Sequence, residues 1–277
     1  MIVKIKNTSS ALGDTIGSVC QVDRYQKITK NTVYYLINKN LIHLFEKAYP
    51  NILFKDTDVF DEYKEIHFHF DQPLQKGYSD DLGLAFEESN TNISFNIKPR
   101  NIKQKYVTLS MQSSHQGRYW NFINGWDFVI KYLKDKYNIS TVCIDKYESF
   151  GNGKNLNYIP KKSINRCGLD LENCCNYLHH AEFHLGTSNG LTWLAHGVNK
   201  KVVLISNVTK NWCEFKKDIY RIDNEKVCHG CFNEEKFDSS NWMWCPRSKN
   251  FECTKTITFE MVKEKIDQCI NELKLVK

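Results

Sequence analysis

The stretch FHLGTSNGLTWLA, residues 183–195, joins a short apolar run to a helical pattern through a series of small and polar residues. Such a strand-to-helix transition is the repeating unit of α/β folds with parallel sheets. At the start of a helix the backbone N–H groups have no helical partner, and the helix dipole adds partial positive charge. We therefore predict a diphosphate seat at Thr187, Ser188, Asn189 and Gly190. The alternative is an ordinary capped helix, because Ser and Asn are common helix caps.

Strand-like and helix-like segments alternate on both sides of this stretch, which predicts an α/β fold with two Rossmann-like halves. The expected strands are Ile2–Ile5, Thr32–Ile37, Ile52–Phe54 and Glu65–Phe70, then Lys105–Ser110, Thr141–Asp145, Glu182–Gly186 and Lys201–Ser206. One helix is expected directly after Gly13. The other expected helices cover Asn40–Ala48, Trp126–Lys136, Leu171–His180, Leu191–Gly197 and Phe259–Leu275. A linker rich in Asn, Ser and Lys, Glu88–Gln104, divides the halves. The last helix is expected to cross back to the first half.

The composition restricts the class of protein. The chain has 277 residues, of which 41% are hydrophobic and 25% charged, as is typical of a globular protein. A run of about 18 apolar residues is missing, which excludes a membrane-spanning helix, and the N-terminus lacks the apolar stretch of a secretory signal. We therefore expect a cytoplasmic protein. The net charge of +6 favours an anionic ligand. A nucleotide diphosphate accounts for it, and nucleic acid remains an alternative.

A second glycine-containing turn lies directly after the first expected strand. Gly13 and Asp14 stand in the segment SALGDTIG, residues 10–17. A glycine at a strand-to-helix turn lets the backbone approach a ligand. Asp14 is then expected at the mouth of a cleft near the carboxyl ends of the strands. The alternative is a plain turn with a helix cap.

A candidate cation stands on the loop after the strand that opens the second half. Arg118 belongs to the segment SSHQGRYW, residues 113–120. A guanidinium group can bind a pyrophosphate in a bidentate manner and neutralise its charge. A lone arginine is more often a solvated surface charge, so Arg118 counts only together with the two turns.

The chain has 11 cysteines, and four of them have the spacing of a metal site. Two cysteines separated by two residues form half of a tetrahedral thiolate site, and two later cysteines complete it. The four are Cys228, Cys231, Cys245 and Cys253. Four sulfur ligands suit zinc or iron and leave no open position for a substrate, so we predict a structural metal. The alternative is four free thiols.

Three motifs resemble those of the heptosyltransferase-type glycosyltransferases in the same order: Leu12-Gly13-Asp14, Gly117-Arg118-Tyr119-Trp120 and Thr187–Ala195. A closer resemblance is to the bacterial autotransporter O-heptosyltransferases. It rests on the segments PLQ (73–75), SDDLGL (79–84), YWN (119–121), NGW (124–126), YLHHAEF (177–183), NKKVV (199–203) and WCEF (212–215), and on the whole Cys228–Cys253 block with WMWCP (242–246).

The resemblance implies a GT-B architecture, with an acceptor-side domain at 1–98 and a nucleotide-sugar-binding domain at 99–277 that carries the four-cysteine site at 228–253. It implies an inverting transferase that moves a heptose-like sugar from a nucleotide-diphosphate donor, ADP-heptose by preference, to Ser or Thr of a protein. Asp14 is expected to be the catalytic base, with Asp71 as the second candidate. Gly13, Arg118 and the seat are expected to bind the donor. The four cysteines are expected to hold iron, and a homo-oligomer is left open.

Two other hypotheses about the function remain open. The Lys-, Asn- and Ile-rich composition is typical of an AT-rich genome such as that of a bacteriophage, where a related enzyme would glycosylate a modified DNA base. DNA binding would then fall steeply with salt. The other hypothesis is a zinc-ribbon adaptor built on Cys228–Cys253. It does not explain the predicted diphosphate seat.

Overall fold

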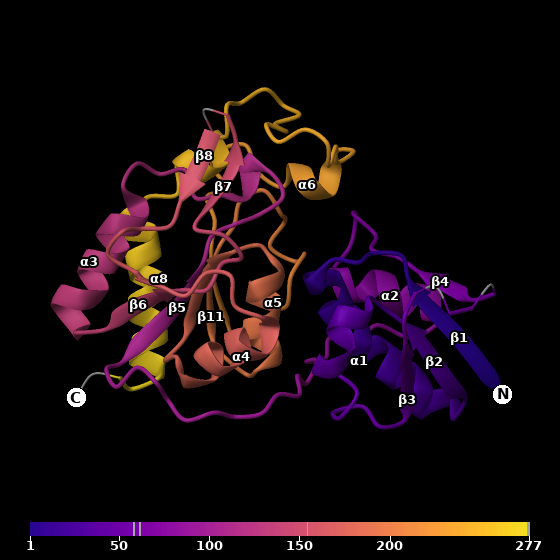
Figure 1. Cartoon of the computed structure of the whole chain (residues 1–277). Coiled ribbons are helices and arrows are strands. Elements are labelled where there is room, and N and C mark those ends of the chain that lie inside the picture. The colour runs from indigo at the N-terminus through magenta and orange to yellow at the C-terminus, as the bar shows by residue number, and fades with distance from the viewer. Residues whose placement is uncertain (58, 61, 154, 276–277) are drawn as a thin grey trace.

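The computed structural model describes residues 1–57, 59–60, 62–153 and 155–275. It has an α/β fold with two parallel sheets, one in each half of the chain (Figure 1). The first half contains β1 (Ile2–Asn7), α1 (Leu12–Thr29), β2 (Thr32–Leu36), the 3₁₀ helix η1 (Lys39–Leu44), β3 (Ile52–Lys55), β4 (Lys64–Ile66) and α2 (Leu74–Leu82). Its strand order is β3-β2-β1-β4.

The second half is built around a sheet of order β12-β11-β10-β5-β6-β9. Its elements begin with β5 (Tyr106–Ser110), the 3₁₀ helix η2 (Gln116–Arg118), α3 (Gly125–Tyr137), β6 (Ser140–Cys143), the antiparallel hairpin β7 (Ser149–Asn152) and β8 (Asn155–Tyr158), and β9 (Ile164–Asn165). They continue with α4 (Leu171–His180), β10 (His184–Thr187), α5 (Gly190–Gly197), β11 (Val202–Ile205), β12 (Ile219–Ile222), the short α6 (Cys231–Glu234) and α7 (Glu252–Lys255), and α8 (Phe259–Glu272).

The α/β prediction is confirmed, and two of the expected elements differ from the structure. The strand expected at Glu65–Phe70 ends at Ile66, because Phe68 and Phe70 leave the sheet and pack against Phe232 of the second half. The helix expected over Asn40–Ala48 is the shorter η1. The elements that were not predicted are strands β7, β8, β9 and β12, the 3₁₀ helix η2 and helices α2, α6 and α7.

Helix α8 does not cross back to the first half. It packs on β11, β12 and α3 of its own half, and Val262, Ile266 and Ile270 are fully buried there. The expected crossing is therefore wrong: its apolar stripe is covered by the second sheet. Across the described part of the chain, no helix has the length and apolar character that a bilayer crossing requires.

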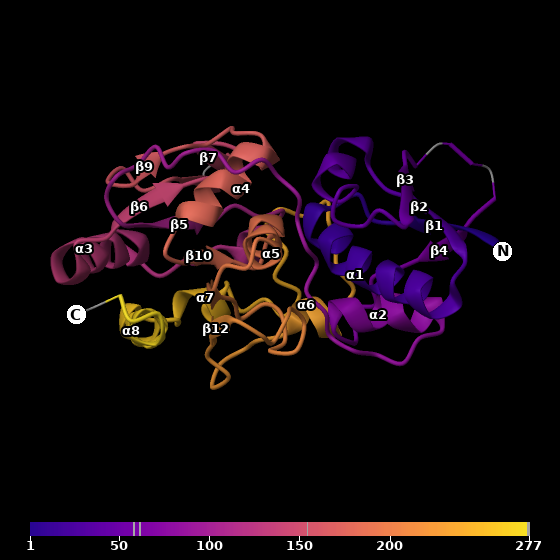
Figure 2. The same ribbon diagram turned by 90° about the horizontal axis from the view of Figure 1, so that it is seen from below.

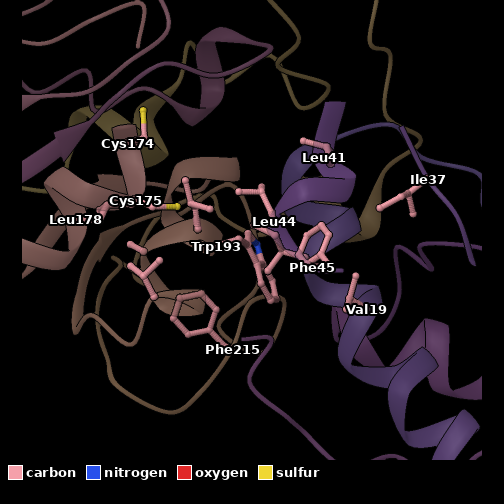
Figure 3. Packing of buried hydrophobic residues seen from close by; sticks show 14 of the residues in the cluster. Val19, Ile37, Leu41, Leu44, Phe45, Cys174, Cys175, Leu178, Trp193 and Phe215 are labelled. Atoms are coloured by element: carbon pink, nitrogen blue, oxygen red, sulfur yellow. The ribbon is translucent and has the colours of Figure 1, made fainter. Parts of the chain in front are cut away.

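A single apolar core joins the two halves. It includes Val19 of α1 and Phe45 from the first half, and Trp193 and Phe215 from the second. Trp193 lies between the side chains of the two halves (Figure 3). Residues 15–22 of α1 are all buried, because the helix is covered by its own sheet, by α2 and by α5.

The segment between the halves, Glu88–Gln104, is hydrogen-bonded to both of them and is therefore a bound strap and not a free linker. It has no helix or strand and passes between the halves (Figure 2). Thr91 donates its hydroxyl to the carbonyl of Ile16 at 2.5 Å. On the other side, the Ile93 amide donates to the carbonyl of Gly197 at 3.3 Å. These bonds connect the strap to α1 and to the end of α5.

Candidate functional site

The first turns of α1 and α5 meet where the two halves adjoin. A Cβ atom on Gly190 would lie 2.9 Å from the Cβ of Leu12 and 3.3 Å from the backbone nitrogen of Gly13. A Cβ on Gly13 would lie 3.0 Å from the indole of Trp193. Glycine at these positions therefore lets the two helix N-termini, each with unpaired N–H groups, converge.

A cavity of about 260 Å³ opens beside this convergence. Six of the predicted residues line it: Gly13, Asp14, Arg118, Ser188, Asn189 and Gly190. The rest of the wall is largely apolar and aromatic: Ala11, Phe68, Phe70, Leu74, Ser114, Trp193, Thr209, Cys213, Glu214, Phe232 and Phe237. The structure therefore brings together three motifs that are up to 177 positions apart in the sequence, from Gly13 to Gly190.

Asp14 is a half-buried carboxylate in the first turn of α1. Burial raises its pKa. Two neighbours oppose this effect: Ser9 donates its hydroxyl to Asp14 Oδ2 at 2.5 Å, and the positive charge of Arg118 favours the ionised form. A carboxylate with a raised pKa at the wall of a cavity is suited to accept a proton.

Arg118 provides a cation with few protein partners. Its Nη1 donates only a long bond of 3.5 Å to the carbonyl of Ser188. Its Nε is buried and has no hydrogen-bond partner. None of the ion pairs found in the described part of the chain includes Arg118. Burial lowers the pKa of the guanidinium, and the neighbouring Cys213, Glu214 and Asp14 act in the opposite direction. The guanidinium of Arg118 thus offers N–H donors that remain available to a ligand in the cavity.

The hydroxyl of Ser188 already donates a hydrogen bond within the protein. It donates to Oε1 of the buried Glu214 at 2.6 Å, and Thr209 donates to the same oxygen at 2.9 Å. Arg221 pairs with Oε2 of Glu214 at 2.5 Å. Because Ser188 has a single hydroxyl proton, it cannot also donate to an anion in the cavity. The Arg221 pair offsets the charge of Glu214 beside Arg118.

Asn189 caps α5. Its Oδ1 accepts from the Thr192 amide at 3.0 Å, and its Nδ2 donates to the carbonyl of Gln112 at 3.1 Å. Thr187 is fully buried behind it and does not line the cavity. As the first two helical residues, Gly190 and Leu191 keep N–H groups without helical partners. The donors available to an anion here are therefore backbone amides at the start of α5, and the hydroxyls of Thr187 and Ser188 are not available.

A second cavity of about 370 Å³ adjoins the first at Asn189 and Gly190, which line both. Its other walls are Leu12, Gln112, Ile144, Asp145, Lys146, Leu169, Asp170, Leu171, Cys174 and Leu191. Asp145 accepts from the backbone amides of Met111 and Gln112 at 3.0 and 3.2 Å. Burial raises the pKa of Asp145 to about 6.

Asp71, the second candidate for the base, lies elsewhere. It is exposed and does not line the cavity, although its neighbour Phe70 does. The loop turns here because the Leu74 amide donates to the carbonyl of Cys213 at 3.0 Å. This geometry separates Asp71 from the other predicted site residues.

The four cysteines of the predicted metal site line one small cavity of about 10 Å³. The pKa values of the Cys231 and Cys253 thiols are raised to about 12, first by burial and then by the neighbouring cysteines of the four. Within the described ranges, however, no group of three or more His, Cys, Asp or Glu side chains is gathered as a metal site. The loop therefore places the four thiols around one space without drawing them into a ligand shell.

Several cavity residues were missed from the sequence. Glu214 stands in a segment quoted for its resemblance, but nothing in the local pattern indicated a role in the cavity. Phe68 and Phe70 were assigned to a strand, and Phe232 and Phe237 stand within the cysteine block. The alternation of His and Phe at residues 67–70 was the available signal for a two-faced segment.

Comparisons with known proteins find similar chains over almost the whole length. The autotransporter heptosyltransferase TibC of Escherichia coli O78:H11 is 32% identical over 282 residues, which covers 92% of this chain and 68% of TibC. The autotransporter heptosyltransferase BAHTCr of Citrobacter rodentium is 31% identical over 279 residues, with the same two coverages. No family model matches the chain.

Solved structures give the same result. The crystal structure of TibC, described as an iron-containing dodecameric glycosyltransferase, aligns with a TM-score of 0.91 at 30% identity and covers 98% of this chain and 76% of that one. TibC has also been solved in complex with ADP-D-β-D-heptose, and that structure aligns with a TM-score of 0.90 at 28% identity, covering 98% of this chain and 77% of that one. The lipopolysaccharide heptosyltransferase II of E. coli shares the fold, with a TM-score of 0.65 at 9% identity over 98% of this chain and 99% of that one.

Proposed function

Because this chain belongs to the autotransporter heptosyltransferase family, we propose that it transfers a heptose from a nucleotide-diphosphate donor to a Ser or Thr hydroxyl of a protein. ADP-heptose is the favoured donor, since TibC has been solved with ADP-D-β-D-heptose. The fold is then of the GT-B type, with an acceptor-side domain at 1–98 and a donor-side domain at 99–277. The boundary falls within the strap, at the start of which Thr91 and Ile93 bind both halves.

One observation carries this proposal: an arginine that pairs with no carboxylate in the described part of the chain faces the same cavity as the start of α5. We propose that the diphosphate lies between Arg118 and the amides of Gly190 and Leu191. Two fixed backbone donors, the positive end of a helix and a guanidinium are the groups that bind pyrophosphate oxygens. The adjoining cavities support this position, because the donor has a nucleoside on one side of its diphosphate and a sugar on the other.

The nucleoside is proposed to occupy the second cavity and the sugar the first. The second cavity offers apolar walls at Leu169, Leu171 and Leu191 for a base, and carboxylates at Asp145 and Asp170 for ribose hydroxyls. The first cavity contains Asp14 and a predominantly aromatic wall. This division places the anomeric carbon near Asp14.

In the proposed reaction, Asp14 accepts the proton of the acceptor hydroxyl while the hydroxyl oxygen attacks the anomeric carbon. The bond from that carbon to the diphosphate oxygen breaks, so the configuration at the carbon inverts. Negative charge grows on the departing diphosphate. Arg118 and the α5 amides stabilise that charge where it develops, which is the main catalytic contribution expected of such a site. No metal ion takes part in this step.

We further propose that Cys228, Cys231, Cys245 and Cys253 hold a structural metal ion. The donor set is chemically suited, because four thiols line one small cavity, although among the described residues they are not gathered into a ligand shell. Thiolate sulfur selects iron or zinc, and iron is favoured because TibC is described as iron-containing. Such an ion would tie the loop that carries α6 to the loop before α7. TibC is also described as dodecameric, so we propose self-association for this chain.

A donor screen tests the proposal. Thermal unfolding is measured with ADP, UDP and GDP and with their sugars, because a ligand that binds only the folded chain raises the melting temperature. ADP and ADP-heptose should raise it, and the other nucleotides should have smaller effects. If none of these nucleotides or sugars binds, the transferase assignment is wrong.

The acceptor is tested separately with ADP-heptose and two acceptors, a Ser/Thr-containing segment of an autotransporter and duplex DNA that contains a modified base. Mass spectrometry should detect heptose on the protein segment. Transfer to DNA, with binding that weakens steeply with salt, would instead support the phage-type alternative.

A further inference from the structure

The guanidinium of Arg118 lies over an aromatic ring. Its Cζ is 4.3 Å from the centroid of Phe232, which belongs to α6 in the cysteine block. Among the described residues the side chain makes one hydrogen bond, the long one to the Ser188 carbonyl. Phe232 is therefore the aromatic side chain that supports this cation.

A ring face holds a cation in a different way from a carboxylate. The attraction is electrostatic and acts through the face of the guanidinium plane, whereas hydrogen bonds are made by the N–H groups in that plane. A carboxylate partner would use two of those N–H groups and neutralise the charge. A phenylalanine below the plane fixes its position and leaves the N–H donors free for phosphate oxygens.

Phe232 is itself held firmly. It is 7% exposed, and its amide donates to the carbonyl of Val208 at 2.9 Å. Gly230 precedes α6 with φ of 72°, a left-handed conformation that glycine adopts without strain. The next residue, Asn233, accepts from the Lys210 amide at 2.8 Å and donates to the carbonyl of Phe70 at 2.7 Å.

The ring also connects the two halves of the molecule. Phe68 stacks on it at 5.9 Å and Phe70 contacts it at 5.3 Å, both from the loop that joins β4 and α2. In two perpendicular views α6 lies beside the first half, although it belongs to the second (Figures 1 and 2). Through Phe232, the position of Arg118 therefore also depends on the β4–α2 loop of the first half.

We propose that Phe232 is a positioning residue that presents the guanidinium of Arg118 to the diphosphate through its ring face. This inference rests on the proposed function, because it assigns Arg118 the diphosphate as its ligand. It predicts that the aromatic face matters at position 232, and not only the apolar volume.

The test uses ADP as the probe and measures its dissociation constant by calorimetry. Phe232→Leu removes the ring face and should weaken ADP binding about 5- to 30-fold, the range expected for a partly desolvated cation–π contact. Phe232→Trp keeps an aromatic face and should retain most of the affinity. Phe259→Leu is the matched control, because Phe259 packs on Phe128 and Tyr132, each at 5.8 Å, and does not line the cavity. It should change ADP affinity by less than about 3-fold.

A double-mutant cycle separates positioning from a general structural effect. In the Arg118→Met background, Phe232→Leu should cause no further loss of ADP affinity, because the cation that the ring supports is gone. Equal losses in both backgrounds, or equal affinity of Phe232→Leu and the unmodified chain, would overturn the inference while the donor assignment stands. If Phe232→Leu does not fold, Phe232→Met removes the ring with the same expected outcomes. Failure of the unmodified chain to bind ADP would overturn the proposed function and this inference with it.

Discussion

Gly190, the first residue of α5, lies against Leu12, the first residue of α1, with no room for a side chain between them. A Cβ atom on Gly190 would stand 2.9 Å from Leu12 Cβ, closer than such atoms approach in proteins. This contact sets the distance between the turn that bears Asp14 and the proposed diphosphate seat. Neither partner can yield by rotating a flexible side-chain end, because the neighbouring atoms are a Cβ and the backbone nitrogen of Gly13.

Replacing Gly190 with Ala should force the two helix starts apart. We expect a loss of about 1–3 kcal/mol in the free energy of unfolding, the usual cost of overpacking, together with at least tenfold weaker ADP binding. Denaturant unfolding and calorimetry measure the two effects. Gly83→Ala is the control: Gly83 has φ of 73° and open space around it, so its substitution should lower stability without affecting ADP binding. Unchanged ADP affinity in Gly190→Ala would contradict this account of the junction.

Asp14→Asn should abolish proton acceptance while keeping the size of the side chain. We expect kcat to fall ~10²–10⁴-fold with little change in ADP affinity. Asp71→Asn should remain close to full activity, because Asp71 is exposed and does not line the cavity. Steady-state transfer assays on both variants distinguish the two candidates. A fully active Asp14→Asn enzyme would remove Asp14 from the mechanism.

Ser9→Ala should shift the pH dependence of the reaction. The Ser9 hydroxyl lowers the pKa of Asp14 against the larger effect of burial, so its loss raises that pKa further. The proposed base acts in its ionised form, and the rate therefore falls as pH drops through this pKa. The acidic limb of kcat/KM should move to higher pH in Ser9→Ala, with a similar plateau above it. An unmoved limb would show that the rate does not depend on the ionisation of Asp14.

Removing the proposed metal should act on both stability and donor binding. Cys231 directly precedes Phe232, so a loosened loop would also displace the ring beneath Arg118. Cys253→Ser should release the metal, lower the melting temperature and weaken ADP binding. Cys269→Ser is the matched control, because Cys269 is a buried cysteine of α8 outside the block. Metal analysis of the purified chain identifies iron or zinc, and a metal-free native protein of unchanged stability would refute the site.

The local pattern was sufficient to predict a large part of the fold. The apolar runs and glycine turns indicated both parallel sheets, and the order of the motifs pointed to the family before any coordinates. The same pattern failed at Phe68 and Phe70, which look like strand residues but leave the sheet. Their positions depend on Phe232, which lies more than 160 residues later in the chain. Contacts of this kind have no signature in the neighbouring sequence.

The candidate site, like the fold, was predictable from the sequence only in part. The sequence alone determined which residues are suited to the chemistry, because glycine turns, a carboxylate, an arginine and small residues at a helix start are local properties. Only the tertiary structure decided which groups remain free to act. The Ser188 hydroxyl donates its hydrogen bond to Glu214, and Asp71 is exposed to solvent. Arg118 keeps N–H donors free for a ligand because an aromatic ring, and not a carboxylate among the described residues, supports it. The physical reason is that a hydrogen-bonding group can serve a ligand only with the capacity that the folded protein leaves unused.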